Sequence, residues 1–255
     1  GNEGICAVVG NFHVLTFDAE QHRERRSGAF WLVNSPQVKI QGLFKFTSRF
    51  PGVACLTGLI VTGDSISGHT LRFEHIGPAE WQTGTRVTWD NHEVLPGFPS
   101  EYSSPDGILR GRKQSVDAGS AHKVGGTLPV FEFYLGTDLF VYIVMGPDFA
   151  SAAVRMKKPP GAQDGVCGNF NCVGADDVQA QVQARGFAQP LSAAESLFGG
   201  VPGVDAQPAP DRPCDPPLEV EARRICADAG SRELIDACAY DSCRAGSTRV
   251  TPVLE

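Results

Sequence analysis

The chain has 255 residues, 42% of them hydrophobic, so it can bury one large domain or a domain of about 150 to 180 residues plus a smaller one. Its net charge of −7, with no long basic run, argues against nucleic acid and anionic membrane surfaces as partners. The longest apolar stretch, Leu139 to Met145, is too short to span a membrane and fits a buried strand. The 29 glycines and 18 prolines favour a β-rich body with many turns.

Runs of β-branched and aromatic residues predict strands along the first 160 residues. Val38 to Thr47 alternates between apolar residues and the polar Lys39, Gln41 and Lys45, which indicates a strand with one face buried and the other in solvent. Further strands are predicted at Val14 to Phe17, Ala29 to Val33, Ala54 to Thr62, His69 to Ile76, Thr85 to Trp89 and Ile108 to Gly111.

The next predicted elements form a hairpin. Thr127 to Leu135 and Leu139 to Met145 flank a three-residue turn, which predicts two paired strands. We expect Ala152 to Met156 to form a short edge strand that Pro159 and Pro160 end. Strands at this spacing, without helices between them, predict an antiparallel β-sandwich over residues 1–178.

After Asp177 the pattern changes. The sequence from Ser192 to Glu195 fits a capping box, which predicts a short helix through Phe198. The Gly, Pro and Ala-rich stretch that follows predicts a linker, so we assign residues 179–213 to a short helix and a linker. Leu218 to Ala229 and Ser231 to Arg244 are predicted helices of a small C-terminal module at residues 214–255.

Eight cysteines are spread along the chain without a Cys-x-x-Cys pair, which favours disulfides in an oxidising compartment over a zinc site. Four of them lie in the C-terminal module, which is too small to hold together by core burial alone. Their pairing stays open, although Cys238 and Cys243 are expected to bond elsewhere than to each other. Since the chain starts at Gly1 without a signal peptide, we expect a processed or excised piece of a protein of the secretory pathway or cell surface. The eight are Cys6, Cys55, Cys167, Cys172, Cys214, Cys226, Cys238 and Cys243.

Oxygen-bearing side chains are densest between Gly165 and Asp177. Asn169, Asn171, Asp176 and Asp177 lie there among glycines that let the backbone turn tightly. Ca2+ takes six to eight oxygen ligands, and a short turning segment of this kind supplies them. The alternative interpretation is a Gly/Asn turn between strands that carries two exposed aspartates.

These motifs together resemble a protein family. The segment from Cys6 through Gly10, Asn11, Phe12 and His13 to Thr16, Phe17 and Asp18 resembles the opening of a von Willebrand factor type D domain. The segment from Gly165 to Asn171, followed by Asp176 and Asp177, resembles the closing calcium motif of that domain. The tail from Leu234 to Cys243 is similar to the C8 module that follows type D domains in mucins, zonadhesin-like and von Willebrand-like proteins.

The resemblance implies a β-sandwich whose first and last motifs meet, with a small helical disulfide-rich module behind it. It implies a disulfide between Cys6 and Cys167. By elimination, we then expect Cys55–Cys172 as the remaining pair outside the C-terminal module. It also implies a Ca2+ ion whose ligands come from both motifs, and a divalent cation would offset the repulsion between the carboxylates. The implied ligands are Asp18, Asn169, Asn171, Asp176, Asp177 and a backbone carbonyl near Val173.

The chain departs from the family pattern at several positions. Asn11-Phe12 stands where many members have Asp-Pro, so we expect no self-cleavage there. Asp164 stands where many members have the first cysteine of a Cys-x-x-Cys pair, and Ala19 replaces the usual glycine. The C8-like tail has half of the cysteines that its name implies.

Two functions of different classes remain. The first is a non-catalytic, calcium-binding assembly or adhesion module of a larger extracellular protein, with other protein chains or neighbouring domains as partners and no inserted membrane segment. The second is a secreted hydrolase that uses Ser65, which follows an apolar strand, or a metal-assisted reaction at the aspartates. Such an enzyme needs a base beside Ser65 or an ion with open coordination positions in a cleft.

Overall fold

The computed structural model is a mainly antiparallel β protein, and it describes residues 3–10, 12–24, 26–46, 54–76, 84–117, 127–146, 149–177, 190–199, 214–228 and 232–244. These residues also form η1 (Asp64–Ile66), α3 (Pro216–Ile225), η3 (Cys226–Asp228) and α4 (Arg232–Arg244). The strands are β1 (Glu3–Val9), β2 (His13–Leu15), β3 (Gln21–Arg23), β4 (Gly28–Asn34), β5 (Lys39–Phe46), β6 (Ala54–Thr62), β7 (Leu71–His75), β8 (Thr85–Trp89), β9 (His92–Val94), β10 (Ser100–Ser103), β11 (Leu109–Asp117), β12 (Thr127–Leu135), β13 (Leu139–Met145) and β14 (Ala150–Lys157).

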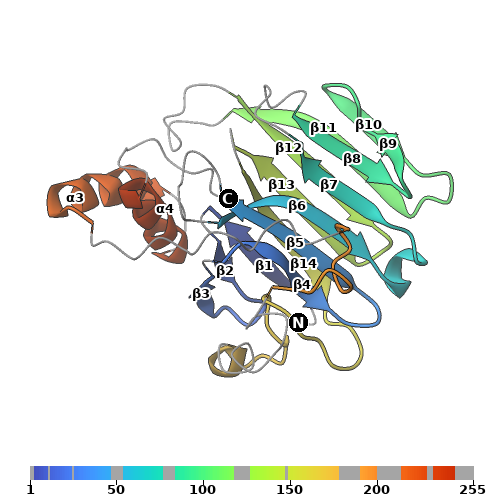
Figure 1. Ribbon diagram of the computed structural model, residues 1–255, viewed down its shortest axis with the longest axis horizontal. Coiled ribbons are helices and arrows are strands. Elements are labelled where there is room, and N and C mark those ends of the chain that lie inside the picture. Colours follow the sequence, from blue (N-terminus) through green and yellow to red (C-terminus); the bar gives the residue numbers. More distant parts are fainter. Residues whose placement is uncertain are drawn as a thin grey trace.

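The described strands belong to one 14-stranded sheet (Figure 1). Its longest path runs β10-β11-β12-β13-β14-β6-β7-β8-β9, while β1, β2 and β3 continue from β14, and β5 and β4 continue from β6. The branches meet at β14, which pairs with β13, with β1 and, through Ala150 and Leu56, with β6. The prediction of an edge strand at 152–156 is therefore wrong, because this strand has neighbours on both sides.

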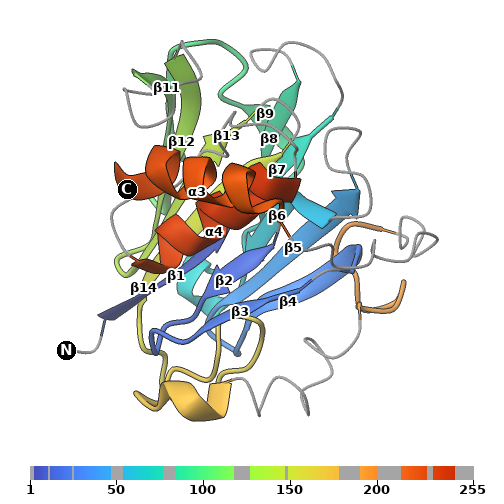
Figure 2. The same cartoon turned by 90° about the vertical axis from the view of Figure 1, so that its left-hand side faces the viewer.

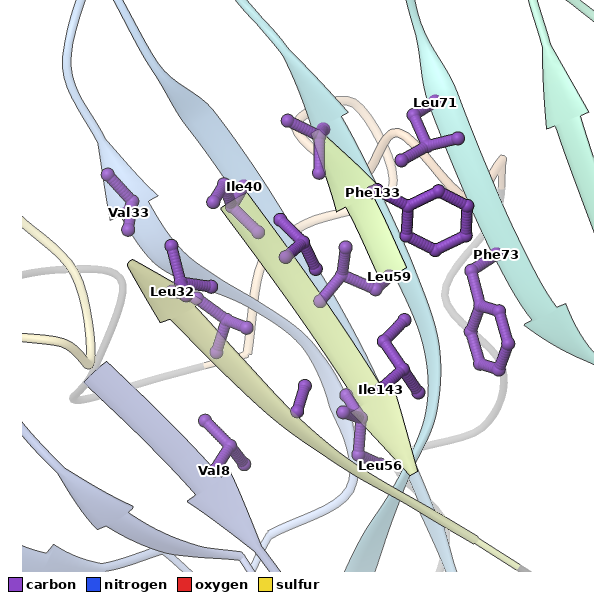
Figure 3. Packing of buried hydrophobic residues seen from close by; sticks show 14 of the residues in the cluster. Val8, Leu32, Val33, Ile40, Leu56, Leu59, Leu71, Phe73, Phe133 and Ile143 are labelled. Carbon is purple, nitrogen blue, oxygen red and sulfur yellow. The ribbon is translucent and has the colours of Figure 1, made fainter. Parts of the chain in front are cut away.

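Strands of the two halves of the sheet face each other across one apolar core (Figure 3). Alternate residues of β13 point inward, as the period of two along a strand requires. Phe131 on β12 packs edge to face against Phe73 on β7, with 5.1 Å between the ring centres. Val8, Leu32 and Ile143 bring β1, β4 and β13 into the same cluster. The predicted hairpin is confirmed, since β12 and β13 have the expected bounds and pair from Leu135–Leu139 onward.

The C-terminal helices form a hairpin that two disulfides close. Cys214 bonds to Cys243, and Cys226 bonds to Cys238, so Cys238 and Cys243 bond elsewhere than to each other, as predicted. Pro216 at the start of α3 suits the first turn of a helix, where its missing N–H costs no hydrogen bond. The apolar cluster between the helices is small, so covalent bonds supply cohesion that core burial does not. The two predicted helices are confirmed, and most of the predicted linker lies outside the described residues.

The helical hairpin lies against the outer face of the sheet (Figure 2). The Nε2 atom of His13 on β2 lies 3.0 Å from Oδ1 of Asp241 on α4, and both side chains are buried. The guanidinium carbon of Arg23 lies 3.8 Å from the ring centre of Tyr240. The buried apolar residues of the contact between the hairpin and the sheet are Ala7, Val9, Val130, Val144 and Ala237.

No helix of the described residues has the length and hydropathy to cross a membrane.

Gln41 on β5 is buried, although the alternation along its strand predicts a solvent-facing side chain. Its Nε2 donates to the carbonyl of Glu195, and its Oε1 accepts the N–H of Leu197, each at 2.8 Å. These bonds hold the segment 190–199, which forms turns rather than the predicted short helix. The contact expected of the capping box still forms, since the hydroxyl of Ser192 donates to the Glu195 carboxylate at 2.7 Å.

We predict that Gln41→Leu lowers the free energy of unfolding by about 2 kcal/mol, because it leaves the carbonyl of Glu195 and the N–H of Leu197 without these partners. Urea denaturation measures the change. Lys45→Leu alters an exposed side chain of the same strand and should stay within about 0.5 kcal/mol of the parent. Equal losses in the two variants would contradict the assignment.

Candidate metal centre

A disulfide joins the beginning of the sheet to the loop that follows its last strand. Cys6 on β1 bonds to Cys167, 161 residues away, with the Cα atoms 5.6 Å apart. The resemblance implies this pair. The N–H of Phe17 donates to the carbonyl of Cys167 at 3.0 Å, and the rings of Phe17 and Phe170 stack at 4.6 Å. The first and last motifs are therefore fixed together by a covalent bond, a hydrogen bond and an aromatic contact.

The same loop is also bonded to β4. The N–H groups of Val166 and Cys167 donate to the carbonyls of Trp31 and Leu32, at 2.9 and 3.0 Å. Gly165 has φ +121°, and a Cβ there would lie 2.6 Å from the Leu32 carbonyl oxygen, so only glycine allows this approach. This close contact holds the start of the loop that carries Asn169, Asn171, Asp176 and Asp177 against β4.

Asp18 holds the tip of the loop. One oxygen of its carboxylate accepts the N–H of Asn171 at 2.9 Å, and the other accepts the N–H of Cys172 at 2.8 Å. The amide oxygens of Asn169 and Asn171 accept N–H groups two residues ahead, which is the Asx turn that such residues favour. The Nδ2 of Asn171 donates to Oδ2 of Asp176 at 2.7 Å.

Asp177 is the buried carboxylate of the centre, with no exposed surface. Its Oδ2 accepts the hydroxyl of Thr16 at 2.5 Å, and its Oδ1 accepts the N–H of Asn169 at 3.0 Å. Burial raises the pKa of Asp177, and the nearby charges of Asp18 and Asp176 raise that pKa further. The folded chain thus keeps the carboxylates of Asp18, Asp176 and Asp177 near one another, and their repulsion makes ionisation of the buried Asp177 more costly.

The residues present suit a hard cation. Oδ1 of Asp176 is buried and has no hydrogen-bond partner among the described residues. Each carboxylate and amide oxygen of the centre has lone pairs beyond those used by its backbone donors. No three His, Cys, Asp or Glu side chains of the described residues converge as a group that could hold a metal ion. The Asp18 and Asp177 oxygens accept hydrogen bonds from backbone N–H groups and from the Thr16 hydroxyl.

The centre also depends on residues for which no role was predicted from the sequence. The hydroxyl of Thr16 donates to the Asp177 carboxylate. The sign of this role in the sequence is that Thr16 lies two residues before Asp18. Gly168 has φ +84°, and a Cβ there would lie 2.3 to 2.5 Å from the carboxylate of Asp177. A side-chain atom at position 168 is therefore excluded by the buried carboxylate itself. Ala19 has φ +63°, in the left-handed region that favours glycine.

The expected Cys55–Cys172 disulfide is wrong. Cys55 is buried in β6 opposite Lys45, whereas Cys172 is exposed at the loop tip, and no bond joins them. Cys172 has φ +72°, and its N–H and that of Asn171 donate to the two oxygens of the Asp18 carboxylate. The Cys172 side chain is exposed in this turn.

The alternative catalytic residue, Ser65, lies in η1 at the rim of a cleft of about 230 Å³ that Thr137, Asp138 and Lys157 also line. Among the described residues, no base is hydrogen-bonded to the Ser65 hydroxyl. The next histidine along the chain, His69, is held elsewhere: Nδ1 lies 2.5 Å from Asp90 and Nε2 lies 2.9 Å from Asp106. Among the residues that the structure describes, Ser65 is therefore not placed in the hydrogen-bonded pair of nucleophile and base that a serine hydrolase needs.

Comparison with known proteins gives no family for this chain: no protein-family model matches it, and no curated protein matches it.

We predict that Gly168→Ala costs more stability than Gly161→Ala. Both glycines have φ near +90°, but a Cβ at 161 meets nothing within 4 Å, whereas one at 168 meets the Asp177 carboxylate. Gly161→Ala should cost about 1 kcal/mol for the backbone conformation alone, and Gly168→Ala about 3 kcal/mol or more because the clash adds to it. Urea denaturation of the two variants checks this, and equal costs would contradict the packing of Asp177 against Gly168.

The His69 contacts predict a pH dependence. The hydrogen bond to Asp90, with the charges of Asp90 and Asp106, raises the pKa of His69 above 6.5. The stabilisation by protonated His69 is then complete below pH 6.5 and is lost as the pH rises through the folded-state pKa. His69→Phe keeps the ring that stacks on Trp89 but removes the charge. The difference in unfolding free energy between parent and variant should fall over that range in urea titrations, and a constant difference would contradict the assignment.

Proposed function

We propose that the chain is a non-catalytic, calcium-binding structural module of a larger extracellular assembly, secreted or at the cell surface. The observation that carries the proposal is the meeting of the two motifs: Asp18 bonds to the backbone of Asn171, 153 residues later, beside Asp176, Asp177 and the Cys6–Cys167 bridge. A surface turn needs no contact with a distant part of the chain. A metal site whose ligands come from two ends of a domain needs such contacts, because they hold the ligands together before the ion arrives.

The electrostatics of the centre support a cation. The raised pKa of Asp177 and the unpartnered Oδ1 of Asp176 are costs to the folded chain. A divalent cation offsets the charge of three carboxylates and gives the free oxygen a partner. Calcium suits the set because all donors are oxygens and the loop bends without a rigid geometry. The residues that would hold it are Asp18, Asn169, Asn171, Asp176, Asp177 and the carbonyl of Val173.

The remaining features fit an assembly module of the von Willebrand type D kind, in adhesion, filament, matrix or mucin-like proteins. The folded-over sheet agrees with a β-sandwich at residues 1–178, and the disulfide-closed helical hairpin agrees with a C8-like module. Three disulfides in a chain of this size are typical of an oxidising, extracellular compartment. The partners in such an assembly are other protein chains or neighbouring domains.

Calcium should stabilise the oxidised protein. We predict that the midpoint of thermal unfolding is about 10 °C higher with excess Ca2+ than with excess chelator, because a ligand that binds the native state alone raises its stability. The double variant Asp18→Asn, Asp177→Asn should show no such difference. Asp64→Asn, an exposed carboxylate in η1, is the matched control and should keep the full calcium effect.

Equal melting of the parent chain under both conditions would count against the site when elemental analysis also finds no bound calcium. Equal melting with one calcium per chain would instead mean that the chelator does not strip the ion. A calcium effect that persists in the double variant would move the ion to another place in the molecule.

A further inference from the structure

The outer face of the sheet carries a row of arginine, aromatic and aliphatic side chains, all exposed except the half-buried Phe140, and here called the aromatic–arginine row. Its members come from neighbouring strands and lie opposite one another in register, so they form one continuous line across the sheet. In order from β11 through β12, β13 and β14 to β1, they are Arg110, Tyr134, Phe140, Arg155 and Ile5.

The side chains of the row contact each other. The rings of Tyr134 and Phe140 are 4.7 Å apart. The guanidinium carbon of Arg110 lies 5.5 Å from the Tyr134 ring centre, and that of Arg155 lies 5.1 Å from the Phe140 ring centre. The two arginines are three strands apart, about 14 Å at the usual spacing between strands. The result is an apolar centre with a cation near each end.

The row stays open to solvent. Tyr134 is 42% exposed and Ile5 is 53% exposed, both large values for side chains of this size. Arg155 pairs with Glu3, whereas Arg110 has no carboxylate within ion-pair distance among the described residues. On a chain with net charge −7, an arginine that contacts the exposed Tyr134 ring, and has no carboxylate partner among the described residues, suits an acidic partner.

The same face already binds a helix at its other end. Two residues along β13 and β14 from the row lie Tyr142 and Ala153, with Glu132 beside Tyr142 on β12, and beyond them the face is covered by α4 through Ala237. Tyr142 belongs to the margin of that contact, and its ring lies 6.3 Å from that of Phe140. The row is therefore continuous with an interface between the sheet and a helix.

The chemistry of the α4 contact indicates what the row would accept. α4 presents Ala237 and Leu234 to the sheet, places the carboxylate of Asp241 against His13, and sets Tyr240 under Arg23. The row offers the same three kinds of contact. It has apolar surface, basic side chains that can pair with acidic groups, and rings that lie against guanidinium groups. Aromatic and arginine residues are also the ones that dominate binding energy at protein interfaces.

We propose that the aromatic–arginine row binds an amphipathic helix with acidic flanks, supplied by a neighbouring chain or domain of the assembly. The apolar side of the helix covers Tyr134, Phe140 and Ile5, and its carboxylates reach Arg110 and Arg155. The inference rests on the proposed function in taking the chain as part of a larger assembly, and it requires nothing of the calcium centre.

The test uses the full oxidised chain and a fluorescein-labelled synthetic peptide of about 18 residues, long enough to form a helix, with leucines on one face and glutamates on both flanks. Fluorescence anisotropy should give saturable binding that weakens as salt is raised. Arg110→Glu and Tyr134→Ser should each raise the Kd about tenfold. Lys45→Glu, which makes the same charge change at an exposed position of β5, should leave the Kd unchanged.

A second peptide with lysine in place of every glutamate should not compete. Absence of binding up to about 1 mM, equal binding to Arg110→Glu, or equal binding of the lysine peptide would overturn the proposal. Self-association of the chain that Arg110→Glu abolishes would also overturn the proposal, because the row would then bind a second copy of the chain. Binding of heparin by the same residues, without binding of the peptide, would overturn it as well. Repeating the titration in Ca2+ and in chelator separates the two claims, since peptide binding that survives loss of the calcium effect supports the row alone.

Discussion

The contact between the first and last motifs of the sheet is the constraint on which the rest of the structure depends. Cys6 lies within β1 and bonds to Cys167, so the loop after β14 cannot separate from the N-terminal strand. Closing a loop of this length restricts the unfolded chain and stabilises the fold by about 5 kcal/mol in the chain-entropy model. Since β14 also joins three branches of the sheet, the same region fixes the ends of β1, β6 and β13.

The charges of the centre follow from that contact. Once Asp18 is bonded to the loop tip and Thr16 to Asp177, the carboxylates cannot move apart to relieve their repulsion. Burial of Asp177 then makes its charged form more costly, which appears as its raised pKa. A structural ion and a covalent bridge would act together here, because the bridge holds the ligands and the ion offsets their charge.

The sequence predicted those parts of the fold that depend on neighbours in the chain. The hairpin of β12 and β13, the strands at 54–62 and 85–89 and the two C-terminal helices follow from local runs of residues and turns. It did not predict the burial of Gln41 or the central place of β14, because each depends on segments that are distant in sequence. In the candidate centre, the residue types at 169–177 and Asp18 were visible in the sequence. The roles of Thr16 and Gly168 were not visible in the sequence, since they depend on where the Asp177 side chain points. The exposed position of Cys172 was not visible either, since its backbone contact is with Asp18, 154 residues earlier.

Equilibrium dialysis of the oxidised chain against radioactive calcium tests the proposed calcium centre most directly. We predict one bound ion per chain at saturation, lost in the Asp18→Asn, Asp177→Asn variant and kept in Asp64→Asn. Replacing Cys6 and Cys167 with serine should weaken binding, because the ligands are then no longer held together before the ion arrives. Absence of bound calcium in the parent chain, or binding that the double variant retains in full, would contradict the calcium centre.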